Sequence, residues 1–295
     1  MDKAILKTLI YADIFDYPLT IFEIHKWLIG KKATLREVEK ALNKLCIKYY
    51  VLSIKGYYCL SKRENLVNKR KRREKQSTAY LRKAKLLVQI LKVIPWIKLV
   101  GISGGLAMDN ADKKDDIDLI LVTSKNRLWV SRILALGLLA LTGQRRKAGE
   151  TGRKIAGKLC LNILLEEDKL DQHSKDIYLA HEVLQMKVLW QRDGIYSRYL
   201  SDNDWAFKFL PNWVGILSIP PIPPIPPNSP DPSNSPNLPD YLEILAKWLQ
   251  LKIMGKPRGM ERIEDGALYF HPNDCRLEIL KIYREKVQKL AGLDK

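Results

Sequence analysis

Residues 101–122 read GISGGLAMDNADKKDDIDLILV and are the most informative segment of the sequence. The apolar run at 97–102 predicts a β-strand that ends in a Gly-Gly turn at Gly104. A short helix and a polar loop follow the turn. The letters DIDLILV then predict a second strand, which begins with Asp116 and Asp118.

Asp116 and Asp118 are two positions apart, so the period of a strand places both carboxylates on one face. Two such carboxylates can hold one divalent cation, and Mg²⁺ with the phosphates of a nucleotide is the usual occupant. At the turn, Gly104 and Gly105 allow backbone N–H groups to approach an anion at the start of a helix. The pattern therefore predicts a site for Mg²⁺ and a nucleoside triphosphate.

The segment Gly101–Val122 resembles the signature of the DNA polymerase beta-type nucleotidyltransferase superfamily. That signature has a Gly-Ser or Gly-Gly turn after one strand and a D-x-D motif on the next. The resemblance covers roughly residues 78–200. It implies an α+β fold with a small mixed-sheet nucleotidyltransferase core flanked by helices. It also implies Mg²⁺-dependent transfer of a nucleoside monophosphate from a nucleoside triphosphate to an acceptor hydroxyl.

The same resemblance assigns residues to the nucleotide. Asp116 and Asp118 match the catalytic, metal-binding pair, and Gly104 matches the glycine of the turn. Gly105 falls where many members have a serine whose hydroxyl touches the triphosphate. Ser103 is the nearest hydroxyl and the candidate to replace it, so we expect Ser103, Gly104 and Gly105 to be nucleotide-binding.

The family also uses a third carboxylate on a later strand. The predicted strand at 158–165, KLCLNILL, has Asn162 as its only polar interior residue, and an amide cannot serve as general base. Glu166 and Glu167 follow at the strand end, and we expect one of them to supply the missing catalytic acid. The alternative is that both belong to a solvated helix start.

Residues 1–64 predict a winged-helix-like domain. Capping boxes at 20–23 and 34–37 open the second and third of three helices, and two short strands at 51–54 and 57–60 follow. The alternative is a generic helical cap. Because the third helix mixes acidic with basic residues, a protein partner suits it better than sequence-specific DNA.

Residues 65–95 predict one long connecting helix that is strongly basic. Residues 61–100 carry 13 of the 51 Lys and Arg residues and only 2 of the 33 acidic ones. We expect the first half to project into solvent or onto the backbone of RNA or DNA. The expected nucleic-acid-binding residues are Lys69, Arg70, Lys71, Arg72, Arg73 and Lys75. The alternative is a solvated helix end that only aids solubility.

The rest of the chain is divided by composition. Residues 96–218 are expected to form the core and its closing helices, including a helix over 173–190. Residues 219–239 are rich in proline and predict an extended linker. Residues 240–295 predict a C-terminal helical region with amphipathic helices at 240–254 and 273–290.

Composition limits the class of protein. Hydrophobic residues make up 46% and charged residues 28% of the 295-residue chain, which excludes a disordered or collagen-like protein. A net charge of +18 indicates an anionic partner. The four cysteines form no C-x-x-C pair, so we expect free thiols and a cytoplasmic protein. The N-terminus predicts no signal peptide, and neither apolar stretch, 133–143 or 209–230, predicts a membrane span.

Two functions follow as hypotheses. The first is a magnesium-dependent nucleotidyltransferase whose acceptor could be RNA, a protein side chain or a small molecule. The alternative is a non-catalytic nucleotide- or nucleic-acid-binding regulatory protein with a decayed site. A module that assembles a complex through the winged helix and the proline-rich linker is a third class.

Overall fold

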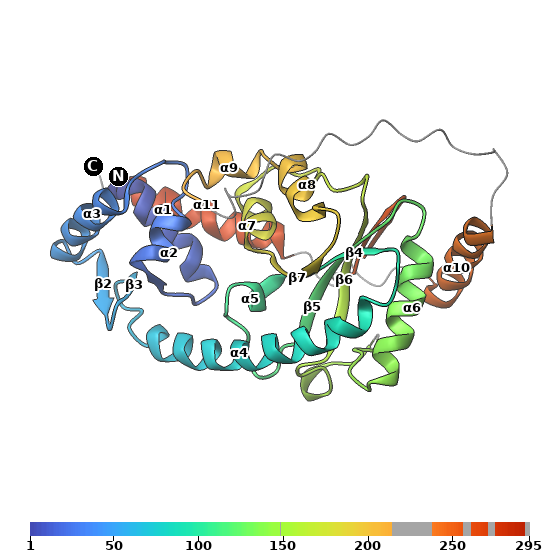
Figure 1. The fold of residues 1–295 in the computed structure, drawn as a ribbon. Helices are drawn as coiled ribbons and strands as arrows, with labels where there is room; N and C mark the ends of the chain where they lie inside the picture. The colour runs from blue at the N-terminus through green and yellow to red at the C-terminus, as the bar shows by residue number, and fades with distance from the viewer. Residues whose placement is uncertain (148, 214–237, 256–260, 271–274, 293–295) are drawn as a thin grey trace.

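The computed structural model describes residues 1–147, 149–213, 238–255, 261–270 and 275–292. It is a mixed α+β protein in which helices surround a mixed β-sheet, as the sequence predicts (Figure 1). The N-terminal part and the sheet lie at opposite ends, and one long helix runs along both (Figure 1). The predicted linker at 219–239 lies outside the described residues except for its last two positions.

The N-terminal part contains the predicted three helices and hairpin. Its elements are α1 (Asp2–Ile14), β1 (Leu19–Thr20), α2 (Ile21–Lys26), α3 (Leu35–Ile47), β2 (Val51–Ile54) and β3 (Tyr57–Leu60). Both capping boxes are present, with Glu23 reaching back to Thr20 and Glu37 to Thr34. The three strands form an antiparallel sheet in the order β1-β3-β2.

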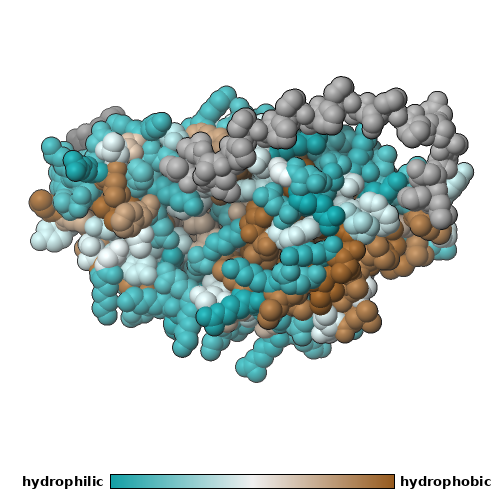
Figure 2. Space-filling view, viewed as in Figure 1, coloured by the Kyte–Doolittle hydropathy of each residue, from teal (hydrophilic) through white to brown (hydrophobic). Residues whose placement is uncertain are grey.

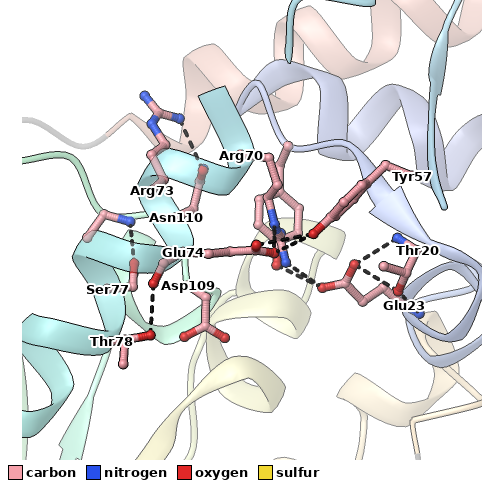
Figure 3. A network of polar contacts seen from close by, with 12 residues as sticks. Thr20, Glu23, Tyr57, Arg70, Arg73, Glu74, Ser77, Thr78, Asp109 and Asn110 are labelled. Carbon is pink, nitrogen blue, oxygen red and sulfur yellow. Dashed lines mark hydrogen bonds and ion pairs between the residues drawn. The ribbon is translucent and has the colours of Figure 1, made fainter. Parts of the chain in front are cut away.

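The long helix α4 (Leu66–Leu91) has the predicted length, but its first half is not free of the protein. Arg70 is buried, donates to Glu74 at 2.7 Å and to Glu23 at 2.8 Å, and lies over the ring of Tyr17 (Figure 3). Arg73 donates to Asn110 at 3.1 Å. The prediction that the whole first half projects into solvent or onto a nucleic acid is therefore wrong for Arg70 and Arg73. Arg70 packs against acidic and aromatic residues of the N-terminal part, and Arg73 contacts the loop at Asn110.

The main sheet has six strands in the order β7-β4-β5-β6-β9-β8. The strands are β4 (Ile97–Ile102), β5 (Ile117–Thr123), β6 (Leu159–Glu166), β7 (Lys187–Gln191), β8 (Arg262–Glu264) and β9 (Ala267–Tyr269). Only β5 and β6 are parallel; the other pairs are antiparallel. The strands β4 and β5 and the short helix α5 (Gly104–Ala107) are those predicted from residues 97–122.

Two parts of the sheet differ from the sequence prediction. The helix expected over 173–190 ends at Gln185, because the backbone of Met186 turns extended and residues 187–191 pair with β4 as an edge strand. Between the C-terminal helices, residues 262–269 form the hairpin β8–β9, and β9 pairs with β6. The C-terminal region therefore completes the main sheet in addition to supplying helices.

Helices cover both faces of the sheet. One face packs against α7 (Ile177–Gln185), α8 (Ile195–Asp202), α9 (Ala206–Phe209) and α11 (Arg276–Gly292), together with Tyr11 and Trp27 of the N-terminal part. The other face packs against the second half of α4, α5, α6 (Leu128–Leu141) and α10 (Leu238–Met254). The alternation along β5 separates Ile120 and Val122 from Leu119 and Leu121, so Asp118 belongs to the α7 face.

The surface is divided between hydrophilic and hydrophobic areas. Hydrophilic side chains project along the lower edge where α4 runs, and hydrophobic residues gather over α6 and α10 (Figure 2). Exposed apolar residues on α10 include Ile244, Trp248 and Ile253. Within the part of the chain that the structure describes, no helix is both long and apolar enough to cross a membrane.

Candidate functional site

Asp116 and Asp118 lie together at the beginning of β5, as the two-residue spacing predicts. Their carboxylate oxygens and the Sγ of Cys160 lie within 4.8 Å of one another. Cys160 joins them because β6 runs parallel to β5 and pairs Cys160 with Asp118. These three side chains form a cluster that could hold a metal ion.

The glycine turn lies against this cluster. The backbone N–H of Ser103 donates to the carbonyl oxygen of Asp118 at 3.1 Å, which fixes the turn to β5. Gly104 has φ +62°, and a Cβ there would lie 3.2 Å from Asp118 Oδ2. A side chain at position 104 would therefore be strained and crowded. The structure brings the predicted turn and the predicted acidic pair into one site.

A pocket of about 240 Å³ opens on the turn and the aspartates. Its lining includes Ser103, Gly105, Asp116, Asp118 and Lys114, and we call it the acidic pocket. Ser103 is buried, and its Oγ has no hydrogen-bond partner among the described residues. A buried hydroxyl without a partner favours a bound polar group or water, and Ser103 is the hydroxyl expected to bind the nucleotide.

The charges in the cluster are unevenly balanced. Arg146 Nη1 lies 2.5 Å from Asp116 Oδ2 and compensates that carboxylate. Burial and the nearby charge of Asp116 raise the pKa of Asp118, which Arg146 only partly offsets. A cation near Asp118 would relieve this unfavourable charge, since an opposite charge favours the ionised form.

The ligand set fits a hard divalent cation bound through two carboxylates. Mg²⁺ is commonly held by one or two protein carboxylates, while phosphates and waters fill its other positions. Cys160 does not extend this set, because burial and the two aspartates raise the pKa of its thiol to about 12 and keep it protonated. A protonated thiol is a poor ligand for a hard cation.

The structure does not bring Glu166 or Glu167 to the aspartates. Glu166 pairs with Thr123, five positions beyond Asp118 on β5, which corresponds to about 17 Å along the strand. Glu167 instead pairs with Lys98 at 2.7 Å. This corrects the expectation that one of them supplies a third catalytic acid.

Asn162 is also not the residue opposite the aspartates. It falls at a register shift, between Leu161, which pairs with Leu119, and Ile163, which pairs with Ile120. The position on β6 that faces Asp118 is Cys160. The sequence prediction used a regular alternation and could not include this register, which depends on how two distant segments pair.

A different carboxylate, that of Glu182 on α7, lies near the site, and the sequence prediction missed it. The backbone of Gly104 and the side chain of Gln185 hydrogen-bond to Glu182, and its charge acts on Asp118. The available signal was an acid among the apolar residues Ala180, Val183 and Leu184 of a helix. A charged residue in such a setting is paired or functional more often than free.

The Glu182 carboxyl predicts a pH-dependent stability. Burial raises its pKa to about 7, and the hydrogen bonds from Gly104 and Gln185 offset this only in part. Because the folded pKa exceeds the unfolded one, the contribution of Glu182 is fully present below the ordinary carboxyl pKa. It is lost as the pH rises through about 7.

We therefore expect Glu182→Gln to stabilise the metal-free protein above neutral pH by on the order of 2 kcal/mol. The gain should vanish near pH 5, roughly where the parent carboxyl is protonated. Thermal unfolding in the presence of a chelator at the two pH values measures the difference. An equal effect of the substitution at both values would contradict the assignment.

The six basic residues of the first half of α4 divide into two groups. Lys69, Arg70 and Arg73 are engaged, with Lys69 paired to Asp16 at 2.5 Å. Lys71, Arg72 and Lys75 are exposed. Only the exposed group retains the character of a nucleic-acid-binding surface, and we call it the basic stripe.

Comparison with family models, curated proteins and solved structures finds no match to this chain.

Proposed function

We propose that this protein is a magnesium-dependent nucleotidyltransferase that moves a nucleoside monophosphate from a nucleoside triphosphate to an acceptor hydroxyl. The observation that carries the proposal is the acidic pocket, in which Asp116 and Asp118 face a glycine turn at the start of two parallel strands. Residues 96–213, completed by the hairpin β8–β9, would then be the nucleotidyltransferase core, and residues 1–64, with their helix order and antiparallel hairpin, a winged helix.

In this proposal, Asp116 and Asp118 hold Mg²⁺, which when bound neutralises the charge of the phosphates. Ser103 donates its buried hydroxyl to a phosphate oxygen, and Gly105 leaves room for the triphosphate. Lys114 adds positive charge at the pocket. Arg146 compensates Asp116 and keeps that side of the cluster ordered.

The test uses the purified full chain and nucleoside triphosphates labelled at the α-phosphate. We expect Mg²⁺-dependent transfer of label together with release of pyrophosphate, with lysate fractions as the source of acceptor. Calorimetric titration of Mg²⁺ with a non-hydrolysable triphosphate measures binding separately from turnover. Absence of both binding and transfer, with Mg²⁺ or with Mn²⁺, would refute the proposal.

A second candidate function is a non-catalytic regulatory protein that binds nucleic acid. Two observations favour it: Cys160 occupies the β6 position that faces Asp118, and the basic stripe is exposed on α4. The winged helix would dock a protein partner in either case, and the free cysteines suit the cytoplasm.

The basic stripe gives this second function its own test. If Lys71, Arg72 and Lys75 contact phosphates, replacing all three with Gln should flatten the salt dependence of RNA or DNA binding. The expected change is about one unit of slope per lost contact. The matched control replaces three exposed basic residues of α11, Lys281, Arg284 and Lys289, and has the same net charge. Equal salt dependence of binding in the two triple variants would show that the basic stripe does not contact the nucleic acid.

A further inference from the structure

A second cavity adjoins the glycine turn and the acidic pocket. It has a volume of about 270 Å³, is partly open to solvent, and is lined by residues of the N-terminal part and of the α7 face of the sheet. Its lining includes Tyr11, Trp27, Asp118, His181 and Glu182, and we call it the aromatic cavity. It shares Gly105 and Asp118 with the acidic pocket, so its contents would adjoin whatever the aspartates hold.

The walls of the aromatic cavity are flat rings from both parts of the protein. Tyr11 of α1 stacks on His181 of α7, with ring centroids 4.1 Å apart and an interplanar angle of 12°. Trp27 stacks on His181 with centroids 5.2 Å apart. Such rings favour the ring or alkyl portion of a small molecule, and their faces attract cations.

One buried polar group in this wall has no partner. His181 is 6% exposed, and its Nε2 makes no hydrogen bond to any residue in the described parts of the chain. Burial lowers the pKa of His181 to about 3, so the ring is neutral and offers a single hydrogen bond there. Buried polar atoms are almost always paired, and the cavity is where a partner for this nitrogen would lie.

The charge of the aromatic cavity is negative. The carboxylates of Asp118 and Glu182 both line it, and the described lining residues include no lysine or arginine. A phosphate would be repelled there. The acidic pocket is also lined by carboxylates, those of Asp115, Asp116 and Asp118, but it adds Lys114 and the site proposed for the divalent cation, whose charge would attract phosphates. The two cavities therefore suit different ends of a reaction, the triphosphate in one and a neutral or cationic molecule in the other.

We infer that the aromatic cavity is the acceptor site and takes a small amino alcohol with an apolar or ring portion. This inference rests on the proposed function. The ring portion packs against the aromatic wall that Tyr11, Trp27 and His181 form, and the amine is attracted by Asp118 and Glu182. A volume of about 270 Å³ is of the size that a small molecule fills.

The transfer step balances with the residues present. The acceptor hydroxyl oxygen forms a bond to the α-phosphorus, and the bond from that phosphorus to the bridging oxygen of pyrophosphate breaks. Pyrophosphate leaves with the electron pair. The hydroxyl proton passes to the carboxylate of Glu182, which lines the acceptor side of Asp118. Glu182 thus takes the catalytic role that the sequence assigned to Glu166 or Glu167.

The first test measures binding alone, without nucleotide or metal, by ligand-observed NMR on the full chain. Three probes share one ring and one hydroxyl: 4-(aminomethyl)benzyl alcohol, 4-methylbenzyl alcohol and 4-(hydroxymethyl)benzoate. We expect the amine to bind about tenfold more tightly than the neutral alcohol, and the carboxylate not to bind. Equal binding of the three, preference for the carboxylate, or no binding of the amine at millimolar concentration would overturn the inference.

Variants locate the site. Glu182→Gln should reduce the preference for the amine over the neutral alcohol several-fold, because only Asp118 then attracts the amine, and Trp27→Leu should weaken both probes. Glu39→Gln, which removes one exposed carboxylate on α3, is the control and should leave both unchanged. An undiminished amine preference in Glu182→Gln would overturn the assignment.

The outcomes separate this inference from the proposed function. Amine binding that depends on Glu182, without any nucleotide binding, would refute the nucleotidyltransferase and with it the acceptor role. Mg²⁺-dependent nucleotide binding without amine binding would refute only the acceptor class. Transfer of label from the triphosphate to 4-(aminomethyl)benzyl alcohol, lost in Glu182→Gln, would support both.

Discussion

Replacing either Asp116 or Asp118 with Asn is expected to abolish Mg²⁺-dependent nucleotide binding and to leave the fold intact. Each variant removes one of the two carboxylates of the cluster that could hold the metal ion. Loss of a direct metal ligand should cost at least as much as loss of an outer partner, which is about 10–100-fold in metal affinity. We therefore expect a loss of about 100-fold or more in affinity for Mg²⁺ with a triphosphate, and no measurable transfer.

The neighbouring acid Asp112 provides the control for this experiment. It lies in the same loop but is exposed and outside the cluster. Asp112→Asn makes the same change of charge and should retain binding within a few-fold. Calorimetric titration of Mg²⁺ with a non-hydrolysable triphosphate gives the affinities, and circular dichroism checks the fold. Unchanged affinity in both site variants would show that Asp116 and Asp118 do not hold the ion.

The acidic pair could be predicted because its geometry is local. Two residues that are two positions apart on one strand share a face, and the glycine turn lies within the same short segment. The capping boxes at Thr20 and Thr34 are local for the same reason. In each case the contacting residues lie only a few positions apart, so their spacing in the sequence is enough to predict the contact.

The other residues near the acidic pair could not be predicted because their positions depend on tertiary packing. Cys160 meets Asp118 through the register between β5 and β6, and Glu182 approaches Gly104 because α7 lies across the same face of the sheet. Residues 187–191 show the same limit, since their apolar pattern also suits a helix and only pairing with β4 makes them a strand.

The prediction for the basic helix was partly wrong for a related reason. Of the partners of Arg70, only Glu74 is close to it in the sequence, whereas Glu23 lies 47 positions away and the stacking partner Tyr17 is also remote. A cluster of charge in the sequence therefore says little about which members are exposed. In the fold, Lys69, Arg70 and Arg73 contact neighbouring parts of the protein, and we call these contacts the joint. The other three basic residues remain exposed as the basic stripe.

That joint predicts a large loss of stability in Arg70→Met. The substitution keeps the volume of the side chain but leaves Glu23 and Glu74 without their cation (Figure 3). Removing one partner of a buried ion pair costs about 3–5 kcal/mol. Glu23 and Glu74 are partly exposed, with 23% and 33% of their side chains accessible, so we expect a value at the low end. Urea unfolding of the full chain measures the free-energy change.

Arg72→Met is the matched control, because Arg72 lies on the same helix and is exposed. It should change the free energy of unfolding by no more than about 0.5 kcal/mol. Adding Glu23→Gln to Arg70→Met should recover part of the loss, since Gln still completes the capping box with Thr20 and no longer carries an uncompensated charge. Equal stability of the Arg70 and Arg72 variants would show that the joint contributes nothing. Because Tyr11 and Trp27 belong to the part that this joint fixes against the sheet, Arg70→Met should also weaken binding of the amine probe in the aromatic cavity, whereas Arg72→Met should not.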